Sequence, residues 1–483
     1  MKRTVVFQVL MALAVCVHGV EEHPVPTALE YRLDVKLDYS TKKLYGTCEI
    51  TFSNGTDRTI EHVPILLYRL LSVTGAGDEN HMALPYTQKI VSISGWEQIQ
   101  VNYIEIELEE ALLPGEQSTI ALEYEGYMFG YSADGWRYVK DNIDRNFTMI
   151  RTDGYGYPVI ACPNERDMMP AQVRHEYTIK VTVPDGLTVV TGGKLTAQSG
   201  SGDGTTHTFR SKKPSWRMDI AVSDYRLFEE GENRVYYFAS DSLGARRVMR
   251  AMQTSFDLYT GWFGPLENYQ GYSIIEVPEG YSSQYDVTAT TLSAENFDAS
   301  KDMNTIYHEI AHAWNVNNLD PQPCRFESEG YARFLEFLLL EKLDQKEDAV
   351  SKEADKYLDR IRAAFTDHEE YQHIPFKDYG VKGMTHYSYS LGMVVFAIFY
   401  DLVGADQFNQ IIGSFYAQYH PSGATLDEFV QHCIKTAGPG LERFFSDWIY
   451  TTEGIHLVME GKSLHELIHF YKAATAIPTL SYL

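Results

Sequence analysis

Two histidines and a glutamate at fixed spacing are the residues of this sequence best suited to catalysis. His308, Glu309 and His312 form an H-E-x-x-H motif. On a helix, residues four apart share a face, so both imidazoles can bind one metal ion while Glu309 points toward a water molecule on that ion. Neutral imidazole is a preferred ligand of zinc, and a carboxylate beside the metal can act as a general base. The motif therefore predicts a site for one Zn²⁺ ion that hydrolyses a bond with an activated water.

A catalytic zinc site needs a third protein ligand and keeps its fourth position open. Glu329 is the best candidate, because it opens a helical segment, residues 329–336, that can pack antiparallel to the first helix across a loop containing two prolines. Glu327 is the alternative, since both carboxylates lie near the start of this helix. A glutamate in a first turn can also serve only the helix dipole.

The first half of the chain has the pattern of β-strands. Apolar and polar residues alternate strictly from Tyr31 to Asp38, and the alternation returns at residues 48–52, 120–124, 177–183 and 218–222. A period of two is typical of strands that bury one face. We therefore expect a β domain over about the first 230 residues.

The period changes after Ser242. Apolar residues then recur every three or four positions as far as Phe263, and Gly264-Pro265 follows as a stop signal, which predicts an amphipathic helix. Later apolar stretches, residues 334–343 and 393–403, are too short to span a bilayer and predict buried core helices. The predicted parts are a signal peptide (1–19), a β domain (20–235), a catalytic domain (236–457) and a C-terminal tail (458–483).

Composition and charge restrict the classes of partner. With 44% hydrophobic and 22% charged residues, the chain has the composition of an ordinary globular protein. The formal net charge of -25 disfavours nucleic acid and anionic lipid, which are bound through clustered lysine and arginine. We expect a peptide substrate, no nucleic acid and no membrane span in the mature chain, while the oligomeric state stays open.

The first residues have the pattern of a secretory signal. Met1 to Arg3 are positively charged, the run from Val5 to Val17 is apolar, and cleavage is expected near Gly19. We therefore expect a secreted or extracytoplasmic protein. Cys16 leaves lipoprotein anchoring as an alternative. The four remaining cysteines could form disulfides in three complete pairings or stay as buried thiols.

The sequence resembles the aminopeptidase N family of zinc metallopeptidases, which are gluzincins. The resemblance is carried by the H-E-x-x-H segment, by Trp314 two residues after it, by residues 328–332 (Ser-Glu-Gly-Tyr-Ala) and by residues 444–448 (Phe-Phe-Ser-Asp-Trp). It covers most of residues 25–457. It implies an antiparallel, saddle-like N-terminal β domain followed by a mainly α-helical, thermolysin-like catalytic domain. It also implies hydrolysis of peptide bonds with one zinc ion.

The same resemblance implies a tyrosine that stabilises the oxyanion of the reaction. In the family this tyrosine comes from a later helix with a Tyr-x-x-Gly turn, and residues 389–392 match that turn. Tyr389 is therefore the expected donor, and Tyr387 is its alternative. A hydrogen-bond donor is needed because negative charge develops on the former carbonyl oxygen.

Two features depart from the family pattern. The family usually has eighteen residues between the second histidine and the glutamate ligand, whereas residues 313–328 number sixteen. The Gly-x-Met-Glu-Asn signature, whose glutamate binds the substrate's free amino group, is missing. The corresponding stretch contains Gln284 and Asp286, of which Gln284 is predicted to bind substrate. Glu295 lies in a sequence that imitates the signature but is only thirteen residues before His308.

We therefore predict a secreted zinc peptidase, with Glu309 as base, Tyr389 as oxyanion donor, and His308, His312 and Glu329 as ligands. The missing signature leaves the choice between removal of terminal residues and internal cleavage open. The alternative function is a catalytically inactive, zinc-containing protein of the same fold that binds peptides.

Overall fold

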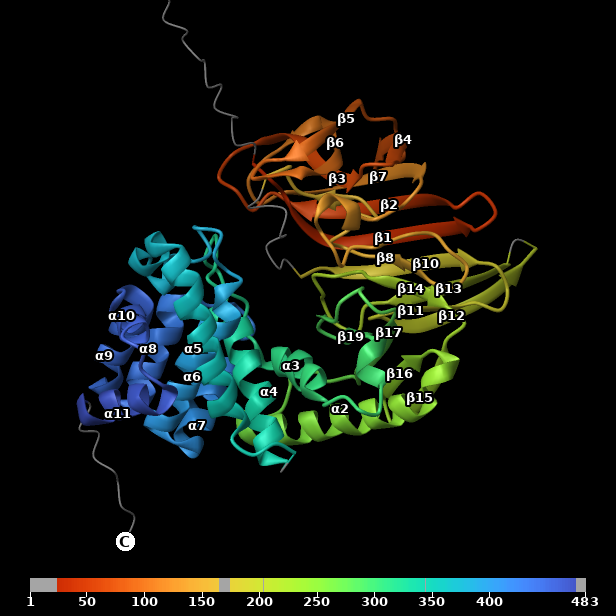
Figure 1. Cartoon of the computed structure of the whole chain (residues 1–483). Coiled ribbons are helices and arrows are strands. Elements are labelled where there is room, and N and C mark those ends of the chain that lie inside the picture. Colours follow the sequence, from red (N-terminus) through yellow and green to blue (C-terminus); the bar gives the residue numbers. More distant parts are fainter. Residues whose placement is uncertain (1–23, 165–173, 203, 344, 475–483) are drawn as a thin grey trace, which may run out of the picture.

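Sheets form the first half of the molecule and helices the second (Figure 1). The computed structural model describes residues 24–164, 174–202, 204–343 and 345–474. The predicted signal peptide and Cys16 lie outside these residues. The predicted order of a β domain followed by a mainly helical domain is confirmed.

The largest sheet has seven strands in the order β12-β13-β10-β1-β2-β7-β4. Strand β1 contains the alternation seen in the sequence, with Tyr31, Leu33 and Val35 buried and the residues between them exposed. One pair departs from the predicted antiparallel pattern, because β1 and β10 are parallel. The strands are β1 (Thr27–Asp38), β2 (Lys43–Ser53), β4 (Leu71–Asp78), β7 (Gln117–Gly126), β10 (Glu176–Val183), β12 (Lys194–Ser201) and β13 (Gly204–Arg210).

Two smaller sheets complete the β domain, with strand orders β5-β6-β3-β9 and β11-β14-β8. The four-stranded sheet consists of β3 (Ile60–Tyr68), β5 (Tyr86–Ile93), β6 (Trp96–Leu112) and β9 (Val159–Ile160). The three-stranded sheet consists of β8 (Thr148–Ile150), β11 (Thr188–Thr191) and β14 (Ile220–Ser223).

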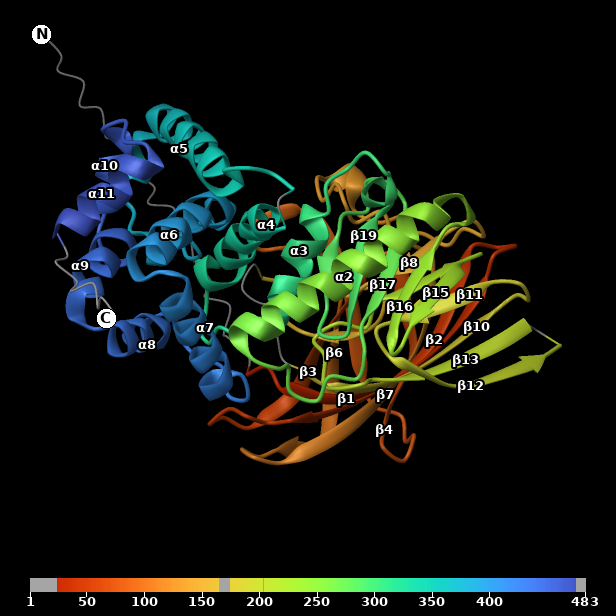
Figure 2. The ribbon, with the colours of Figure 1, turned by 90° about the horizontal axis from the view of Figure 1, so that it is seen from below.

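A five-stranded sheet, in the order β15-β16-β17-β19-β18, carries the chain from the β domain to the helices. Its strands are β15 (Arg226–Glu230), β16 (Asn233–Tyr237), β17 (Ser273–Val277), β18 (Gln284–Tyr285) and β19 (Ala289–Ser293). The predicted division between residues 235 and 236 falls inside β16, which pairs with β17. The helix predicted after Ser242 is α2 (Ser242–Phe263), and it packs along this sheet (Figure 2).

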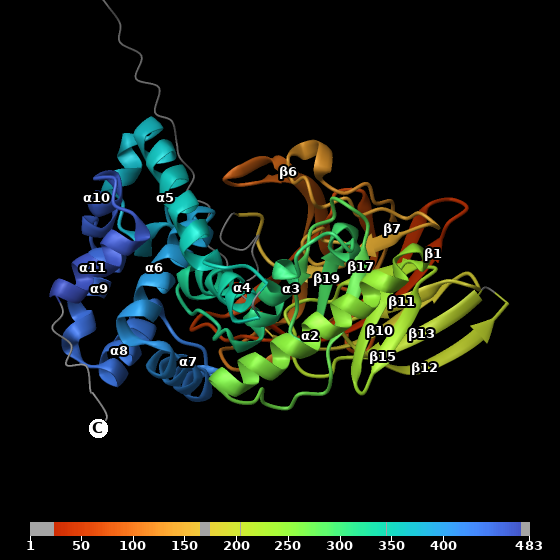
Figure 3. The ribbon, with the colours of Figure 1, turned by 60° about the horizontal axis from the view of Figure 1, so that its bottom comes forward.

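Helices α3 (Asn304–Ala311) and α4 (Tyr331–Lys342) lie between the sheets and a bundle of later helices (Figure 3). α3 and α4 pack against each other, and α4 packs against α6. The bundle contains α5 (Ala349–Asp367), α6 (Tyr387–Val403), α7 (Ala405–Tyr419), α8 (Leu426–Ala437), α9 (Glu442–Phe445), α10 (Glu453–Met459) and α11 (Leu464–Ala474).

Apolar clusters hold these parts together. One fills the β domain, and a second is continuous from the five-stranded sheet through the helices. A third cluster joins the three-stranded and five-stranded sheets, and in it the rings of Phe147 and Tyr281 lie 5.0 Å apart. Burial of apolar area is the main stabilising contribution in such contacts. The segment directly before β8 and the loop before β18 are thereby fixed against each other.

Neither a single membrane-spanning helix nor a complete set of disulfides is found in the described ranges. No single helix there is long and apolar enough to cross a membrane, although α6 and α7, bent by 117° at Gly404, pass such a test as a pair. Cys48, Cys324 and Cys433 are buried free thiols. None of the three complete disulfide pairings is therefore formed.

Candidate metal centre

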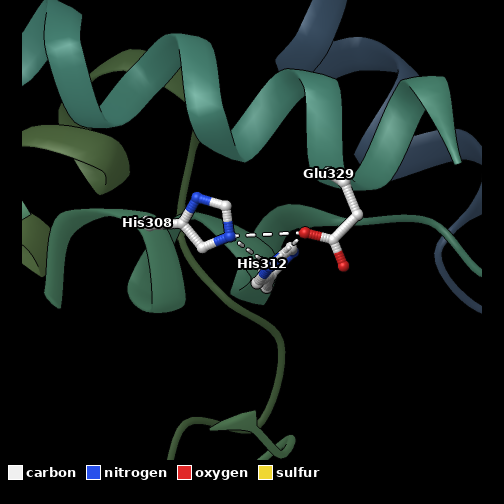
Figure 4. Close-up of side chains that lie close together, drawn as sticks. All are labelled: His308, His312 and Glu329. Carbon is white, nitrogen blue, oxygen red and sulfur yellow. Dashed lines mark hydrogen bonds and ion pairs between the residues drawn. The ribbon is translucent and has the colours of Figure 1, made fainter. Parts of the chain in front are cut away.

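His308, His312 and Glu329 converge on one point (Figure 4). Their ligand atoms all lie within 4.8 Å of one another. His308 Nε2 is 3.2 Å from His312 Nε2 and 3.3 Å from Glu329 Oε2. His312 Nε2 is 3.7 Å from the same oxygen. All three residues are buried.

The two imidazoles converge because they lie one helical turn apart. His308 is in α3, which ends at Ala311, and His312 begins the short 3₁₀ turn η4 (His312–Trp314) with helical backbone angles. Trp314 anchors this turn in the core, where its indole N–H donates a hydrogen bond of 2.9 Å to the carbonyl of Gly264. The i, i+4 relation predicted from the motif thus holds across the end of the helix.

Glu329 reaches the imidazoles from a π-helical turn, η5 (Phe326–Gly330), that directly precedes α4. The sequence predicted an α-helix opening at Glu329, so this local conformation differs from the prediction. A π turn is wider than an α turn and often occurs at functional sites. Arg325 precedes it with a φ of 64°, which is unusual for a residue other than glycine. This turn lets Glu329 reach both imidazoles across an interval two residues shorter than that of the family.

The alternative ligand, Glu327, is turned to other partners. Its carboxylate accepts a hydrogen bond from the side-chain amide of Asn318, and burial raises its pKa to about 7. The group formed by the two imidazoles contains the carboxylate of Glu329 and does not contain that of Glu327. Of the two candidates, Glu329 is therefore the one that the fold brings to the histidines.

Further polar groups orient the three ligands. His308 Nδ1 lies 3.1 Å from Glu336 Oε2, and Glu336 is held in turn by Arg333 and Asn304 at 2.9 and 3.0 Å. The side-chain amide of Asn315 lies 2.8 Å from His312 Nδ1. Contacts to the Nδ1 atoms fix the rings and leave each Nε2 directed at the common point, which is the arrangement that metal-binding histidines usually have.

The electrostatics of the three ligands depend on burial and on their neighbours. Burial alone raises the pKa of Glu329, but Arg325 and the two imidazoles outweigh it and hold this pKa well below its usual range. Burial lowers the pKa of His312 to about 3, so this imidazole is neutral. Burial also opposes charge on His308, but the contacts with Glu329 and Glu336 raise its pKa to about 9. A bound metal ion would replace that proton as the cation between these groups.

Glu309 is buried beside this centre and has no hydrogen-bond or ion-pair partner among the residues described. Burial raises the pKa of Glu309 to about 7, and the neighbouring carboxylates Glu329 and Glu336 add to the effect. A carboxylate without a protein partner is available to accept a proton from a water molecule.

Tyr389, rather than Tyr387, lies at the centre. The rings of Tyr389 and His308 are nearly parallel, with an interplanar angle of 7° and a centroid separation of 6.5 Å. Burial and Glu329 raise the pKa of Tyr389 well above its usual value, so the hydroxyl keeps its proton. Tyr387 packs instead against Phe365 and Tyr371.

The stretch that replaces the family signature contacts both α3 and the β domain. Gln284 lies in β18, which packs on α3, and its side chain bonds residues of the β domain. Asp286 is buried, accepts hydrogen bonds from Ser215 and from the backbone N–H of Val287, and has a pKa raised to about 6 by burial. Glu295 is exposed on the 3₁₀ turn η3 (Ala294–Phe297).

The geometry of the three ligands fits zinc. In a tetrahedral site with bonds of about 2.0–2.2 Å, neighbouring ligand atoms are separated by about 3.4 Å. The three separations here, 3.2, 3.3 and 3.7 Å, surround this value. Two nitrogens and one carboxylate oxygen are also the donor set of many catalytic zinc sites, which leave a fourth position for water.

Comparison with known families decides the class of the protein. Residues 285–448 match the peptidase family M1 domain. This protein carries a peptidase family M1 domain. The M1 domain includes His308, His312 and Glu329, and the predicted resemblance to the aminopeptidase N-like zinc peptidases is confirmed. The protein is a zinc metallopeptidase, with Zn²⁺ as its cofactor.

Solved structures of M1 peptidases share the fold. The M1 zinc metallopeptidase from Deinococcus radiodurans is 17% identical, with 88% of this chain and 94% of that chain covered and a TM-score of 0.66. A mutant of that protein bound to the substrate Tyr-Ser-Ala is 18% identical and has a TM-score of 0.65. The match again covers 88% of this chain and 94% of that chain. A mutant two-domain M1 zinc metallopeptidase bound to L-tryptophan is 17% identical and has a TM-score of 0.67. The match covers 88% of this chain and 95% of that chain. No curated protein matches the chain significantly.

Three residues around the metal centre were not predicted from the sequence. Glu336 could have been found, because it lies seven residues after Glu329 and therefore on the same face of a helix. Asn315 could have been found from its place directly after the motif. Arg325 could also have been found, because it lies four residues before Glu329, which brings the two side chains to one face of a helical turn.

Proposed function

We propose that the protein hydrolyses peptide bonds with a water molecule that Glu309 deprotonates. The observation that carries this proposal is the unpartnered, buried carboxylate of Glu309 beside three convergent ligands. When bound, Zn²⁺ lowers the pKa of a water ligand and polarises the carbonyl of the scissile bond. Glu309 accepts the water's proton and delivers it to the leaving amine.

Tyr389 is the proposed donor to the oxygen that becomes negative during the attack. Its hydroxyl stays protonated, and its helix lies against the turn that carries Glu329. A fixed donor of this kind stabilises the transition state more than the substrate, because the charge on the oxygen develops only during the reaction. Peptide as the substrate class is supported by the relative that is bound to Tyr-Ser-Ala.

The test is the substitution Glu309→Gln, which keeps the shape of the side chain and removes the base. We expect zinc content near one ion per chain, measured by plasma mass spectrometry, and a loss of about 10²–10⁴-fold in kcat on a peptide library. Glu295→Gln is the matched control, because Glu295 is an exposed carboxylate away from the metal, and it should leave both quantities unchanged.

Two outcomes would contradict this assignment. Wild-type activity in Glu309→Gln would show that another group is the base. A wild-type protein that holds zinc and cleaves no member of the library would favour the alternative, an inactive peptide-binding protein of the same fold.

The cellular location of the protein is proposed from the first residues of the chain. The charged start and the apolar run from Val5 to Val17 support export with removal of a signal peptide near Gly19. Mass spectrometry of the amino end of the protein recovered from its native host tests this. An intact Met1 on a protein retained in the cytoplasm would contradict export, and a lipid on Cys16 would identify the anchored form.

A further inference from the structure

Two arginines are the charged side chains with the largest exposed fractions around the metal centre. Arg325 keeps 32% of its side-chain surface exposed, and Arg333 keeps 29%. The carboxylates that pair with them are much less exposed, since Glu329 keeps 10% and Glu336 keeps 1%. Glu309 is buried as well. A ligand at this centre therefore meets positive charge, although the whole chain has a formal net charge of -25.

Both guanidinium groups lie beside the ring of Tyr389. The central carbon of the Arg325 group is 5.4 Å from the centre of this ring, and that of the Arg333 group is 6.0 Å from it. Tyr389 is the proposed donor to the carbonyl oxygen of the scissile bond. The side chain of a substrate residue next to that bond therefore lies within reach of Arg325.

Arg325 has hydrogen-bond donors to spare. Its Nη2 donates to the oxygen of Glu329 that points away from the imidazoles (Figure 4), and its Nε and Nη1 donate to no residue in the described ranges. A guanidinium group carries five N–H donors and can bind more than one carboxylate. Arg217 of the same protein does so, with Asp219 at 2.9 Å and Asp153 at 3.1 Å.

The backbone holds Arg325 in place. Its φ of 64° is sparsely populated by residues other than glycine, and such conformations often occur where a ligand is bound. Its carbonyl accepts hydrogen bonds from the backbone N–H of Glu329 at 3.0 Å and from the hydroxyl of Ser328 at 3.3 Å. Its neighbours Cys324 and Phe326 are buried. A group that is fixed in this way loses little conformational freedom when it binds a ligand.

Arg333 adds a second positive charge at the same place. Its Nη1 donates to both carboxylate oxygens of Glu336, at 2.9 and 3.0 Å, which fixes the guanidinium group. Burial is the main cause of the lowered pKa of His312, and the charges of both arginines add to this effect. The positive potential of the pair therefore extends to the metal ligands, where little water is present to screen it.

We propose that Arg325 binds a carboxylate in the side chain of the substrate residue next to the scissile bond, and that Arg333 strengthens this binding by its charge. The inference rests on the proposed function, and it assigns to the enzyme a preference for glutamate or aspartate at that bond. An acidic residue before the bond and one after it present the same chemistry, and the experiment distinguishes the two positions.

The test uses two pairs of tripeptides, Glu-Ala-Ala with Gln-Ala-Ala and Ala-Glu-Ala with Ala-Gln-Ala, and mass spectrometry identifies the cleaved bond. We expect the wild type to prefer the acidic member of one pair by about 10–100-fold in kcat/KM, because a charge-assisted hydrogen bond is formed. Arg325→Met should abolish this preference. The ratio within a pair is independent of zinc occupancy, since the same loaded fraction of the enzyme hydrolyses both members.

Arg443→Met is the matched control. Arg443 is paired at 3.5 Å with Asp447, four residues later, and lies 5.2 Å from the ring of Phe470, so it resembles Arg325 in its contacts. It belongs to α9, in the helical bundle and away from α3 (Figure 1). This variant should keep the wild-type preference for the acidic peptide.

Binding separates this inference from the proposed function. Calorimetry with zinc-loaded Glu309→Gln should show tighter binding of the acidic member of the same pair, and the additional substitution Arg325→Met should remove the difference. The melting temperature of each variant checks its folding. Equal values for acidic and amide peptides in the wild type, or an unchanged ratio in Arg325→Met, would overturn the role of Arg325. Absence of all turnover with selective binding retained would contradict the hydrolase and keep the carboxylate site.

Discussion

Gly330 and Gly392 bring the glutamate ligand's turn and the tyrosine's helix into direct backbone contact. A Cβ atom on Gly330 would lie 2.7 Å from the Cα of Gly392, and the reverse distance is the same. Glu329 directly precedes Gly330, and Tyr389 lies one helical turn before Gly392. The glycine of the Tyr-x-x-Gly turn therefore has a packing role, which sets the separation between the metal ligand and the proposed oxyanion donor.

Gly392→Ala should move these two elements apart. We expect a loss of about 1–3 kcal/mol in the free energy of unfolding, as for other overpacked positions, together with a lower kcat. Chemical denaturation and peptide hydrolysis measure the two effects. Gly261→Ala is the control, because Gly261 is exposed in α2 with no atom near the added Cβ, and it should raise stability by about 0.5–1 kcal/mol. A fully active and stable Gly392→Ala protein would show that the close approach is dispensable.

Tyr389→Phe should remove the proposed donor and keep the ring that lies parallel to His308. We expect kcat to fall by about 10²–10³-fold with KM nearly unchanged, because the hydrogen bond forms only as charge develops. Tyr387→Phe should leave kcat unchanged, since Tyr387 packs against Phe365 and Tyr371. The prediction fails if the two substitutions have equal effects in steady-state kinetics.

Arg325→Met should weaken zinc binding. Arg325 holds one oxygen of Glu329 and leaves the other directed at the imidazoles, so its loss frees the carboxylate to turn. Partners of metal ligands typically contribute about 10–100-fold to affinity, and competition of the metal-free protein with a chelating dye measures this. Glu327→Gln should leave the affinity unaltered. If zinc affinity is the same in Arg325→Met, the contact does not orient the ligand.

Stability should depend on pH through Glu276, which is fully buried in β17. Burial, with a contribution from the charge of Asp241, raises the pKa of Glu276 from 4.5 to about 8, although the backbone N–H of Phe238 opposes the shift. The folded state therefore holds a proton that the unfolded state releases above pH 4.5. This contribution to stability is complete below that pH and is lost as the pH rises through about 8.

Glu276→Gln should remove this dependence. Relative to the wild type, we expect the variant to be about 1–3 kcal/mol more stable at pH 9, where the wild type carries a buried charge, and to be nearly equal at pH 5. Urea unfolding at the two pH values measures the difference. The exposed Glu279→Gln is the control and should show no such pH dependence. Parallel stability curves for Glu276→Gln and the wild type would contradict the assignment.

The sequence by itself determined those features that depend only on residues close together in the chain. The i, i+4 spacing of His308 and His312 requires only a helical turn to direct both imidazoles to one side, and strict alternation along β1 requires only one buried face. For this reason the metal pair, the β domain and the helix after Ser242 could be predicted without a structure. The H-E-x-x-H motif and residues 328–332 also sufficed to predict the resemblance to the zinc peptidases, which the match to the peptidase family M1 domain confirms.

Only the tertiary structure decided which distant groups meet. The sequence favoured Glu329 and left Glu327 as an alternative, and the π turn after Arg325 determines which of them faces the histidines. Asp153 lies in the loop after β8 and Gln284 lies in β18, and no periodicity relates residues whose contact depends on how two packed layers are joined. Local patterns are set by short-range backbone geometry, whereas contacts across 131 positions depend on the packing of the whole chain.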